Sequence, residues 1–287
     1  MFYSPLRYPG GKNKLAKFIA QICVDNNING HYVEPYAGGA SVALHLLIEK
    51  KVKKITINDF DRSIYAFWYS VLNHTEELCD LIKNTPIDIE NWYKQRQIQK
   101  DKLTTDLLEL GFSTLFMNRT NISGIVIAGV IGGLKQQGKY KIDCRFNKES
   151  IISRIKLIAS LKKDIDLKNL DAIELIKTIQ KKSKIESTLF YFDPPYYDKG
   201  PSLYMNFYKH DQHVQVSESI KNIKNMSWLV SYDNQPEIHD IYSWAKNRII
   251  EYSFNHSAHK SRVGKEVIIT SESLKQIPEV IICTYKS

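Results

Sequence analysis

The sequence predicts an α/β protein in which a doubly wound, mostly parallel sheet is interrupted by an inserted, mostly helical segment. Three observations lead to this fold class. Apolar runs of strand length alternate with amphipathic helical segments near both ends of the chain. Several of these runs end in an acid or in a turn rich in Gly or Pro, as strands do where an open sheet binds ligands. Residues 65–148 instead show helical periodicity, with no clear strand before residues 125–131.

The first elements form a strand–turn–helix unit. After a helix predicted from residue 14 to about residue 24, a short strand at residues 31–34 runs into Pro-Tyr-Ala-Gly-Gly-Ala-Ser at residues 35–41, and a helix follows. This is the layout of a nucleotide-type cofactor site, because glycines let the backbone approach a ligand at a helix N-terminus. The full G-x-G-x-x-G pattern is absent, so an ordinary turn between strand and helix is the alternative.

A second strand, at residues 53–59, ends in Asp59. An acid at the end of this strand can accept hydrogen bonds from the ribose hydroxyls of a cofactor. Asp59, Asp61 or both could instead cap the helix that is predicted to start near Ser63.

The insertion contains the polar run Asn118-Arg119-Thr120-Asn121, followed by a glycine-rich stretch. Arg and Asn side chains read guanine and adenine edges in DNA, so Asn118, Arg119 and Asn121 are candidate DNA-binding residues. The alternative is that they cap and brace helices inside the insertion. A basic strip that includes Lys139 follows and suits phosphates, although such strips are often simply solvated.

The last part of the chain returns to α/β alternation. Strands are predicted at residues 165–167, 189–192, 228–231, 266–270 and 280–284, with helices at 150–161, 173–179, 214–223 and 236–245. Asp171 precedes one of these helices and is either its N-cap or a cofactor contact. A polar loop precedes the strand at 266–270, and its Lys260 and Arg262 are further candidate DNA-binding residues.

The most informative motif is Asp193-Pro194-Pro195-Tyr196, which directly follows an apolar strand that the prolines must end. An amine on a heteroaromatic ring is a poor nucleophile, because its lone pair is delocalised. The Asp193 carboxylate and the Pro194 carbonyl could accept its two hydrogens and stabilise the charge that develops during attack. Tyr196 or Tyr197 offers a ring on which a flipped-out base can stack. The alternative is a double-proline turn with no catalytic role.

Composition narrows the class of partner and the compartment. The formal net charge of +9 favours an anionic partner, with nucleic acid first, although biased composition could also explain it. The four cysteines form no C-x-x-C pair, which indicates neither a metal site nor a disulfide framework and suits the reducing cytoplasm. The chain has no signal-peptide pattern and no run of 18 apolar residues.

Five motifs in order give a family resemblance: R-Y-P-G-G-K at residues 7–12, V-E-P-Y-A-G-G-A-S-V at 33–42, I-N-D at 57–59, N-R-T at 118–120 and D-P-P-Y at 193–196. With them the chain resembles the Dam-type (D12 class) N6-adenine DNA methyltransferases, which use S-adenosyl-L-methionine. The resemblance implies a Rossmann-like methyltransferase sheet with a target-recognition domain at residues 65–150. Residues 1–64 and 151–287 would then form the catalytic domain.

The resemblance also assigns roles to residues. Asp59 would bind the ribose, Asp171 would approach the cofactor's adenine, and Asp193 would touch both cofactor and target base. Arg119 falls where the family has an arginine facing DNA. The remaining cofactor contacts would come from the first two motifs, at Tyr8, Lys12, Glu34, Pro35, Ala37, Gly38 and Ser41.

The sequence departs from the family pattern at two places, which limits what the resemblance implies. The first glycine of the cofactor turn is displaced, and residues 121–133 lack the tyrosine-rich sequence of Dam proteins, so recognition of GATC does not carry over. We predict a monomeric, site-specific adenine methyltransferase that acts on a flipped base in double-stranded DNA. Whether a separately acting restriction endonuclease is its partner stays open. Methylation of cytosine N4, RNA or protein glutamine, or an inactive DNA-binding relative, are the alternatives.

Overall fold

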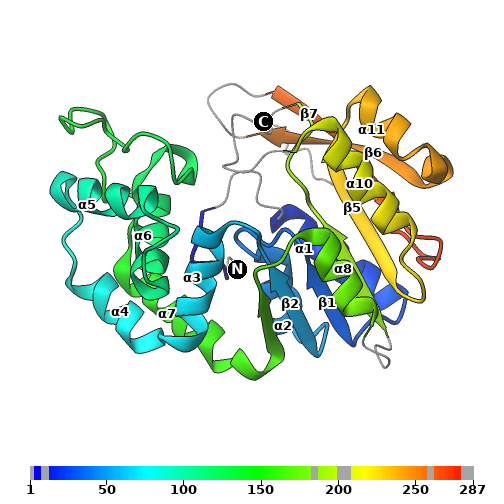
Figure 1. Cartoon of the computed structure of the whole chain (residues 1–287), viewed down its shortest axis with the longest axis horizontal. Helices are drawn as coiled ribbons and strands as arrows, with labels where there is room; N and C mark the ends of the chain where they lie inside the picture. The colour runs from blue at the N-terminus through cyan, green and yellow to red at the C-terminus, as the bar shows by residue number, and fades with distance from the viewer. Residues whose placement is uncertain (1–2, 8–12, 182–186, 199–207, 257–261, 279–287) are drawn as a thin grey trace.

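The computed structural model describes residues 3–7, 13–181, 187–198, 208–256 and 262–278. Within these residues, seven strands form a single sheet in the order β3-β2-β1-β4-β5-β7-β6 (Figure 1). The strands are β1 (His31–Glu34), β2 (Lys54–Asn58), β3 (Ile165–Lys168), β4 (Thr188–Phe192), β5 (Ser227–Asp233), β6 (Ile249–His256) and β7 (Arg262–Thr270). The predicted doubly wound α/β fold is confirmed.

The strand order reverses at β1, which lies between β2 and β4. β1 pairs in parallel with both neighbours, so that Val33 lies opposite Thr56 on one side and Phe190 on the other. β3 and β5 extend the parallel sheet outwards, and β7 runs antiparallel to both β5 and β6. In an open α/β sheet, ligands bind beyond the carboxyl ends of the strands at such a reversal. The topology therefore indicates a ligand site beyond the carboxyl ends of β1 and β4.

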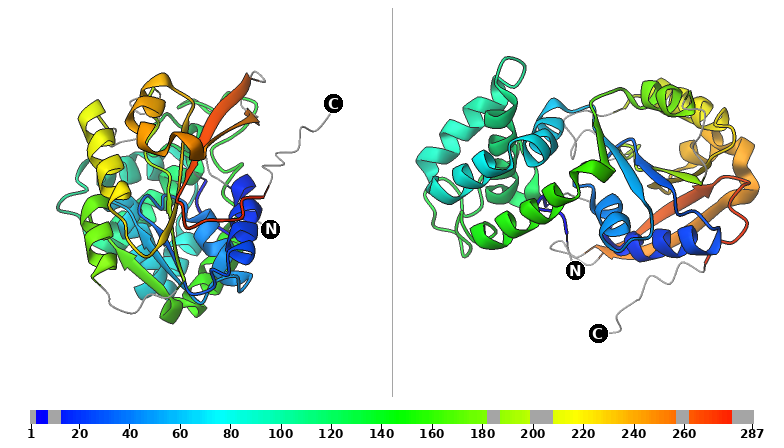
Figure 2. Two further views of the ribbon diagram at one scale, coloured as in Figure 1. Left: turned by 90° about the vertical axis from the view of Figure 1, so that its right-hand side faces the viewer. Right: turned by 90° about the horizontal axis from the view of Figure 1, so that it is seen from below.

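Helices cover both faces of the sheet (Figures 1 and 2). α1 (Asn13–Asp25) and α2 (Ser41–Ile48) lie on one face, and α8 (Ala172–Gln180) and α10 (His210–Lys221) lie on the other. Side chains alternate between two hydrophobic clusters along the strands, since Tyr32 belongs to one cluster and Val33 to the other. Each strand at the centre of the sheet is thus buried on both sides, as its continuous apolar sequence predicts.

The insertion is a helical lobe beside the sheet (Figure 1). It comprises α3 (Arg62–Asn73), α4 (Thr75–Asn84), α5 (Ile89–Lys100), α6 (Leu107–Thr120), the short helix η1 (Ile122–Gly124) and α7 (Lys148–Ser160). α3 and α6 pack so closely that a Cβ atom at Gly111 would lie 2.5 Å from the carbonyl oxygen of Ala66. The predicted domain boundaries, after residues 64 and 150, fall inside α3 and α7.

Two element predictions differ from the structure, at residues 125–131 and 236–245. Residues 125–131 form turns rather than a strand, with one isolated bridge between Asn121 and Val130. The Asn121 amide donates to the carbonyls of Ile125 and Val126, which removes acceptors that a strand partner would need. The helix predicted at 236–245 divides into α11 (Pro236–Ile241) and the 3₁₀ helix η3 (Ser243–Arg248), and a further 3₁₀ helix, η2 (Lys162–Asp164), precedes β3. The strand predicted at 280–284 lies outside the described residues.

A buried amide joins the loops that follow β1 and β3. Asn58, the last residue of β2, is fully buried. Its Nδ2 atom donates to the carbonyl oxygens of Pro35 and Leu170, both at 2.9 Å, and its Oδ1 atom accepts from Leu170 N at 2.9 Å. One side chain at the end of β2 therefore fixes the positions of both neighbouring loops.

Replacing Asn58 by Ala should destabilise the protein by about 3 kcal/mol, because each buried polar group left without a partner costs roughly 1–3 kcal/mol. Urea denaturation measures the loss. The matched control is Asn73→Ala on exposed helix surface, which should change the free energy of unfolding by less than about 0.5 kcal/mol. Equal stabilities for the two variants would contradict the role given to Asn58.

Candidate active site

Four acids lie at the carboxyl ends of neighbouring strands. Glu34 ends β1, Asp59 follows β2, Asp193 follows β4 and Asp233 ends β5. Because these strands are parallel, their carboxyl ends meet at one edge of the sheet. The sequence predicted three of these acids as site residues, and the topology brings all of them to the same edge.

The turn after β1 is fixed to the end of β2. Gly38 N donates to Asp59 Oδ2 at 2.9 Å, and Ala37 N donates to the Asn58 carbonyl at 2.8 Å. The Gly38 carbonyl accepts from the indole of Trp68 at 2.9 Å. Gly38 and Ala40 both adopt the left-handed conformation, at φ +46°, which costs the alanine roughly 1–2 kcal/mol. Strained backbone of this kind is typical of functional turns that their surroundings hold in place.

Glu34 is a buried carboxyl group beside this turn. It is 4% exposed, and its Oε1 atom accepts from the Tyr32 hydroxyl at 2.9 Å and from Ala43 N at 3.1 Å. Burial raises the pKa of Glu34 to about 8, and the nearby Asp193 adds to the rise, while the two hydrogen bonds oppose it. A cation placed next to Glu34 would reverse this balance and favour the carboxylate.

The sequence left open whether Asp59 or Asp61 caps the next helix, and the structure gives the two acids different hydrogen-bond partners. Asp61 caps α3 by accepting from Ser63 N at 2.8 Å. Asp59 instead accepts from Gly38 N and from Asp61 N, and burial, followed by the Asp61 charge, raises its pKa to about 7. The ring of Phe60 beside it is 63% exposed. Asp59 thus faces the glycine turn, with an accessible aromatic ring next to it.

The loop after β3 completes this part of the edge. Asn169 Nδ2 donates to the carbonyls of Asp59, at 2.7 Å, and Phe60, at 3.2 Å. Asp171 caps α8 by accepting from Ile173 N at 2.8 Å, so its interpretation as an N-cap is confirmed. The sequence analysis gave no role to Asn58 or Asn169, although both lie within three residues of a strand end, where such a role could be expected.

Asp193 is oriented by a short chain of hydroxyl groups. Its Oδ1 atom accepts from Ser231 Oγ at 2.8 Å, and Ser231 Oγ lies 2.9 Å from the Tyr191 hydroxyl. The proline turn itself is held by Asp233, whose two oxygens accept from the backbone N–H groups of Tyr197 (2.9 Å) and Asp198 (3.2 Å). Asp233 lies two residues beyond the strand predicted at 228–231 and was not among the predicted site residues.

The two tyrosines of the turn have different surroundings. Tyr196 is 6% exposed, and its hydroxyl donates to Glu266, which also accepts from Tyr252. Tyr197 is partly exposed, and its hydroxyl lies 3.0 Å from His210 Nδ1. A base could reach the face of the Tyr196 ring only after a local rearrangement, whereas the Tyr197 ring is partly exposed.

More aromatic side chains continue from Tyr197. The rings of Tyr197 and Tyr208 lie 5.1 and 5.4 Å from the ring of His213, and the Tyr208 hydroxyl is 3.1 Å from that of Tyr36. His213 is fully buried with Nδ1 2.9 Å from the Tyr232 hydroxyl, and burial, followed by the His210 charge, lowers its pKa to about 4. A neutral aromatic wall therefore adjoins the proline turn.

Two predicted DNA contacts are wrong. Asn118 and Asn121 are both buried, and their amides are used inside the protein. Asn118 binds the backbone of Arg7 and the Gly124 carbonyl. Asn121 accepts from the Trp92 indole at 2.7 Å and donates to two carbonyls of the following turn. Neither amide is available to a base edge, and the bracing role that the sequence allowed is confirmed.

The other predicted DNA contacts stay predictions. Arg119 is half-buried and donates to the carbonyls of Pro5 and Arg145, the latter at 3.4 Å. Burial lowers its pKa to about 10, with further contributions from the charges of Arg154 and Arg7. Lys139 is exposed, with Nζ 5.8 Å from the centre of the Tyr140 ring. The predicted DNA contact Lys260 and the side chain of Arg262 lie outside the described residues. So do Tyr8 and Lys12, which are predicted cofactor contacts.

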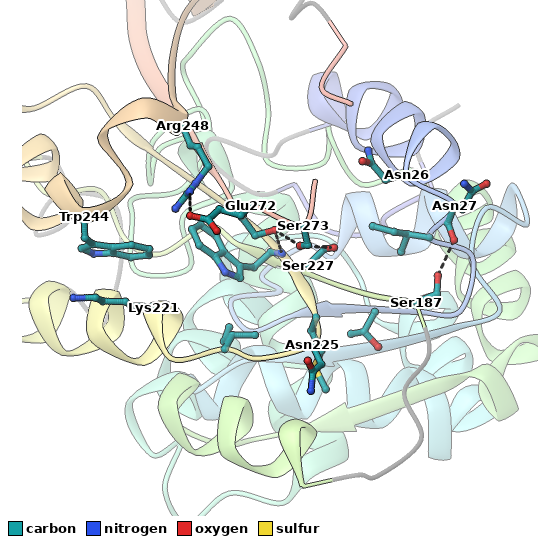
Figure 3. A pocket seen from close by; sticks show the side chains of 16 residues that line it. Asn26, Asn27, Ser187, Lys221, Asn225, Ser227, Trp244, Arg248, Glu272 and Ser273 are labelled. Carbon is teal, nitrogen blue, oxygen red and sulfur yellow. Dashed lines mark hydrogen bonds and ion pairs between the residues drawn. The ribbon is translucent and has the colours of Figure 1, made fainter. Parts of the chain in front are cut away.

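A separate hollow of about 690 Å³ lies at the opposite ends of the strands (Figure 3). Its lining includes Thr188 and Ser227, which begin β4 and β5, and an ion pair of 2.5 Å between Arg248 and Glu272. Among the described residues, no cluster of His, Cys, Asp and Glu could hold a metal ion. None of the described helices is long and apolar enough to span a membrane.

The topology and the acids at the strand ends define an α/β enzyme with a nucleotide-type cofactor site. Residues 8–256 match the D12 class N6 adenine-specific DNA methyltransferases, and the chain belongs to that family. It is therefore an adenine-specific DNA methyltransferase, and its cofactor is S-adenosyl-L-methionine.

Two curated relatives and one solved structure that are similar to this chain are as follows. The chain is 25% identical to the type II methyltransferase M.CviBI of Paramecium bursaria Chlorella virus NC1A, over 94% of this chain and 98% of that protein. It is 23% identical to M.MjaIII of Methanocaldococcus jannaschii, over 67% and 68% of the two chains. A SAM-dependent methyltransferase from Agrobacterium tumefaciens superposes with a TM-score of 0.42 at 6% identity, over 88% of this chain and 60% of that one.

The residues present fit the cofactor. S-adenosyl-L-methionine carries a sulfonium, an ammonium and two ribose hydroxyls, and the edge offers two carboxyl groups whose pKa burial raises to about 8 at Glu34 and about 7 at Asp59. A nearby cation or hydroxyl donors would stabilise the carboxylate form of both groups and lower their pKa.

Glu34 should make stability fall as the pH rises. Its pKa in the folded protein, about 8, lies above its ordinary value of 4.5, so its contribution is complete below pH 4.5 and is lost as the pH rises through 8. Glu34→Gln cannot ionise and should lose less stability between pH 5 and pH 9, with a difference above about 1.4 kcal/mol, the value of one pKa unit. Urea denaturation at both pH values measures this.

The control for Glu34→Gln is Glu237→Gln on the exposed surface of α11, which should follow the wild-type pH dependence. If the curve of Glu34→Gln ran parallel to that of the wild type, Glu34 would not be a protonated, buried carboxyl group.

Proposed function

We propose that this protein transfers a methyl group from S-adenosyl-L-methionine to the exocyclic N6 amine of an adenine flipped out of double-stranded DNA. One observation carries the proposal: Asp193 and Pro194 directly follow β4, beside the glycine turn after β1, at the reversal of strand order. The family membership supports the same chemistry.

The cofactor would lie along the loops after β1 and β2. Asp59 would accept the ribose hydroxyls, and the exposed Phe60 ring would offer a face to the adenine moiety, which Asp171 approaches. The turn at residues 34–41 would surround the methionine portion through Glu34, Pro35, Ala37, Gly38 and Ser41. Tyr8, Lys12 and Asp193 complete the proposed contacts. When bound, the cofactor supplies an electrophilic methyl group.

The amine would be activated by Asp193 and Pro194. Accepting its two hydrogens at the Asp193 carboxylate and the Pro194 carbonyl localises the lone pair on nitrogen, and the carboxylate stabilises the positive charge that develops there. Ser231 holds Asp193 Oδ1 in place, and Asp233 keeps the turn from moving away. Transfer is direct, with no covalent bond to the protein.

The base would leave the duplex to reach Asp193, because an exocyclic amine inside the stack is out of reach of the carboxylate. Tyr197 is the more exposed ring of the turn, and Tyr196, the last residue of the D-P-P-Y motif, would stack on the base after rearranging. Both rings suit a planar, uncharged base.

The DNA backbone would follow the helical lobe, which we propose as the target-recognition domain. We define the recognition loop as residues 121–147. Its exposed basic residues Lys135, Lys139, Lys141 and Arg145 suit phosphates, and residues 119–142 contain no acid. Arg119, Lys260 and Arg262 would add further phosphate contacts. The overall charge of +9 favours the same partner.

The proposal also includes an oligomeric state, a functional partner and a compartment. The proposed cofactor-binding and catalytic residues all come from one chain, so we propose a monomer. The two curated relatives are type II methyltransferases by name, which supports a separately acting restriction endonuclease as a functional partner. We propose a cytoplasmic location, which a DNA substrate and the absence of a C-x-x-C pair in the sequence both support.

The direct test is transfer of labelled methyl from S-adenosyl-L-methionine to unmethylated genomic DNA, with nucleoside digestion and mapping of the modified sites. We expect N6-methyladenine at one short motif. Asp193→Asn should lower the rate at least about 100-fold, because it removes a charge that acts in the transition state. The matched control is Asp240→Asn on the exposed surface of α11, which should keep the wild-type rate.

The contradicting outcomes are equally specific. Label in N4-methylcytosine, RNA or protein would replace the proposed substrate. A wild-type rate for Asp193→Asn would remove Asp193 from the mechanism, and cofactor or DNA binding without any transfer would favour an inactive relative.

A further inference from the structure

The backbone of Arg7 is held by a single side chain from the helical lobe. Asn118, on α6, accepts from Arg7 N at 2.7 Å and donates to Arg7 O at 2.6 Å. The amide thus pairs with both backbone groups of one residue, as a neighbouring strand would. Asn118 is 1% exposed, so water does not compete for these hydrogen bonds.

The same amide reaches the start of the recognition loop. Asn118 Nδ2 also donates to the Gly124 carbonyl at 2.7 Å. Gly124 has φ +77°, and a Cβ atom there would lie 2.3 Å from the Arg7 carbonyl oxygen. Only glycine permits this approach. Arg7, Asn118 and Gly124 therefore form one tightly packed unit, which we name the Asn118 joint.

Further bonds fasten the residues around Arg7 to the lobe. Arg154 donates to the Ser4 carbonyl at 3.0 Å, and Arg119 donates to the Pro5 carbonyl. The guanidinium of Arg7 in turn reaches the Asn121 carbonyl, at 3.5 Å, in the recognition loop. The N-terminal segment and the loop are thus held against each other from both sides.

Arg7 is bonded directly to Tyr8, the first residue of the segment that we propose contacts the cofactor. If DNA binding to the recognition loop shifts Gly124, it must therefore move Arg7 or break the Asn118 joint. We propose that Asn118 is a positioning residue that couples DNA binding at the recognition loop to cofactor binding. This inference rests on the proposed function. Coupling of this kind is reciprocal, so each ligand changes the affinity of the other by the same factor.

The test is a thermodynamic cycle with sinefungin, an unreactive analogue of the cofactor, and a short synthetic duplex that contains the mapped motif. Calorimetry gives the sinefungin affinity of the wild type with and without the duplex, and the ratio of the two is the coupling factor. We expect a factor in the usual range of about 5 to 150 for the wild type. In Asn118→Asp, which keeps the acceptor and loses both donated bonds, the factor should fall to within about twofold of one.

The matched control is Gln99→Glu. Gln99 is also buried, its amide also donates two bonds, to the hydroxyls of Ser113 and Thr114, and its Oε1 atom also accepts one, from Ser63. These partners lie in the helical lobe, outside residues 4–7 and outside the recognition loop. The two variants should lose similar stability, but Gln99→Glu should keep the coupling factor. If a buried carboxylate prevents folding, the pair Asn118→Ala and Gln99→Ala replaces them.

Three results would overturn the inference: no coupling in the wild type, wild-type coupling in the Asn118 variant, or equal loss of coupling in both variants. The last result would reduce Asn118 to a purely structural role. The proposed function fails separately, because it requires methyl transfer by the wild type and loss of transfer in Asp193→Asn, whatever the coupling factor.

Discussion

The site depends on the buried amide of Asn58 more than on any residue that would touch a ligand. Through three hydrogen bonds it sets the loop after β1 against the loop after β3, and it thereby fixes the distance between Glu34 and Asp171. Asp233, at the end of β5, likewise holds the proline turn after β4 in place through two hydrogen bonds. Binding residues can be held to a precise geometry only when such supporting bonds are in place.

The electrostatics of the edge follow from this rigidity. Glu34 and Asp59 cannot move towards water, and burial raises the pKa of Glu34 to about 8 and that of Asp59 to about 7. Carboxyl groups held in this way destabilise the protein at high pH and bind a cationic ligand well when it arrives. The recognition loop on the helical lobe has the opposite character, since it is basic and exposed and suits the phosphates of DNA.

The sequence predicts the parts of the fold and site that depend on local pattern. The apolar run before Asp193, the acid at the end of β2 and the capping position of Asp171 each follow from a few neighbouring residues. Asn118 and Asn121 could not be assigned in this way, because an amide pairs equally well with a base edge or with a peptide group, and only burial distinguishes the two. Asp233 binds a turn 36 residues away in sequence, which no local pattern reveals. Residues 125–131 have strand composition, but the Asn121 amide takes the carbonyls that a strand would use.

Hydrogen–deuterium exchange with and without sinefungin tests the central claim, that the cofactor lies at the reversal of strand order. Slower exchange is predicted in peptides that cover residues 34–41, 58–60 and 169–172, which the Asn58 and Asn169 amides hold together. Exchange around the hollow at the other end of the strands, at residues 187–188, 226–228 and 271–273, should not change. Protection confined to that hollow, with none at the three loops, would contradict the account.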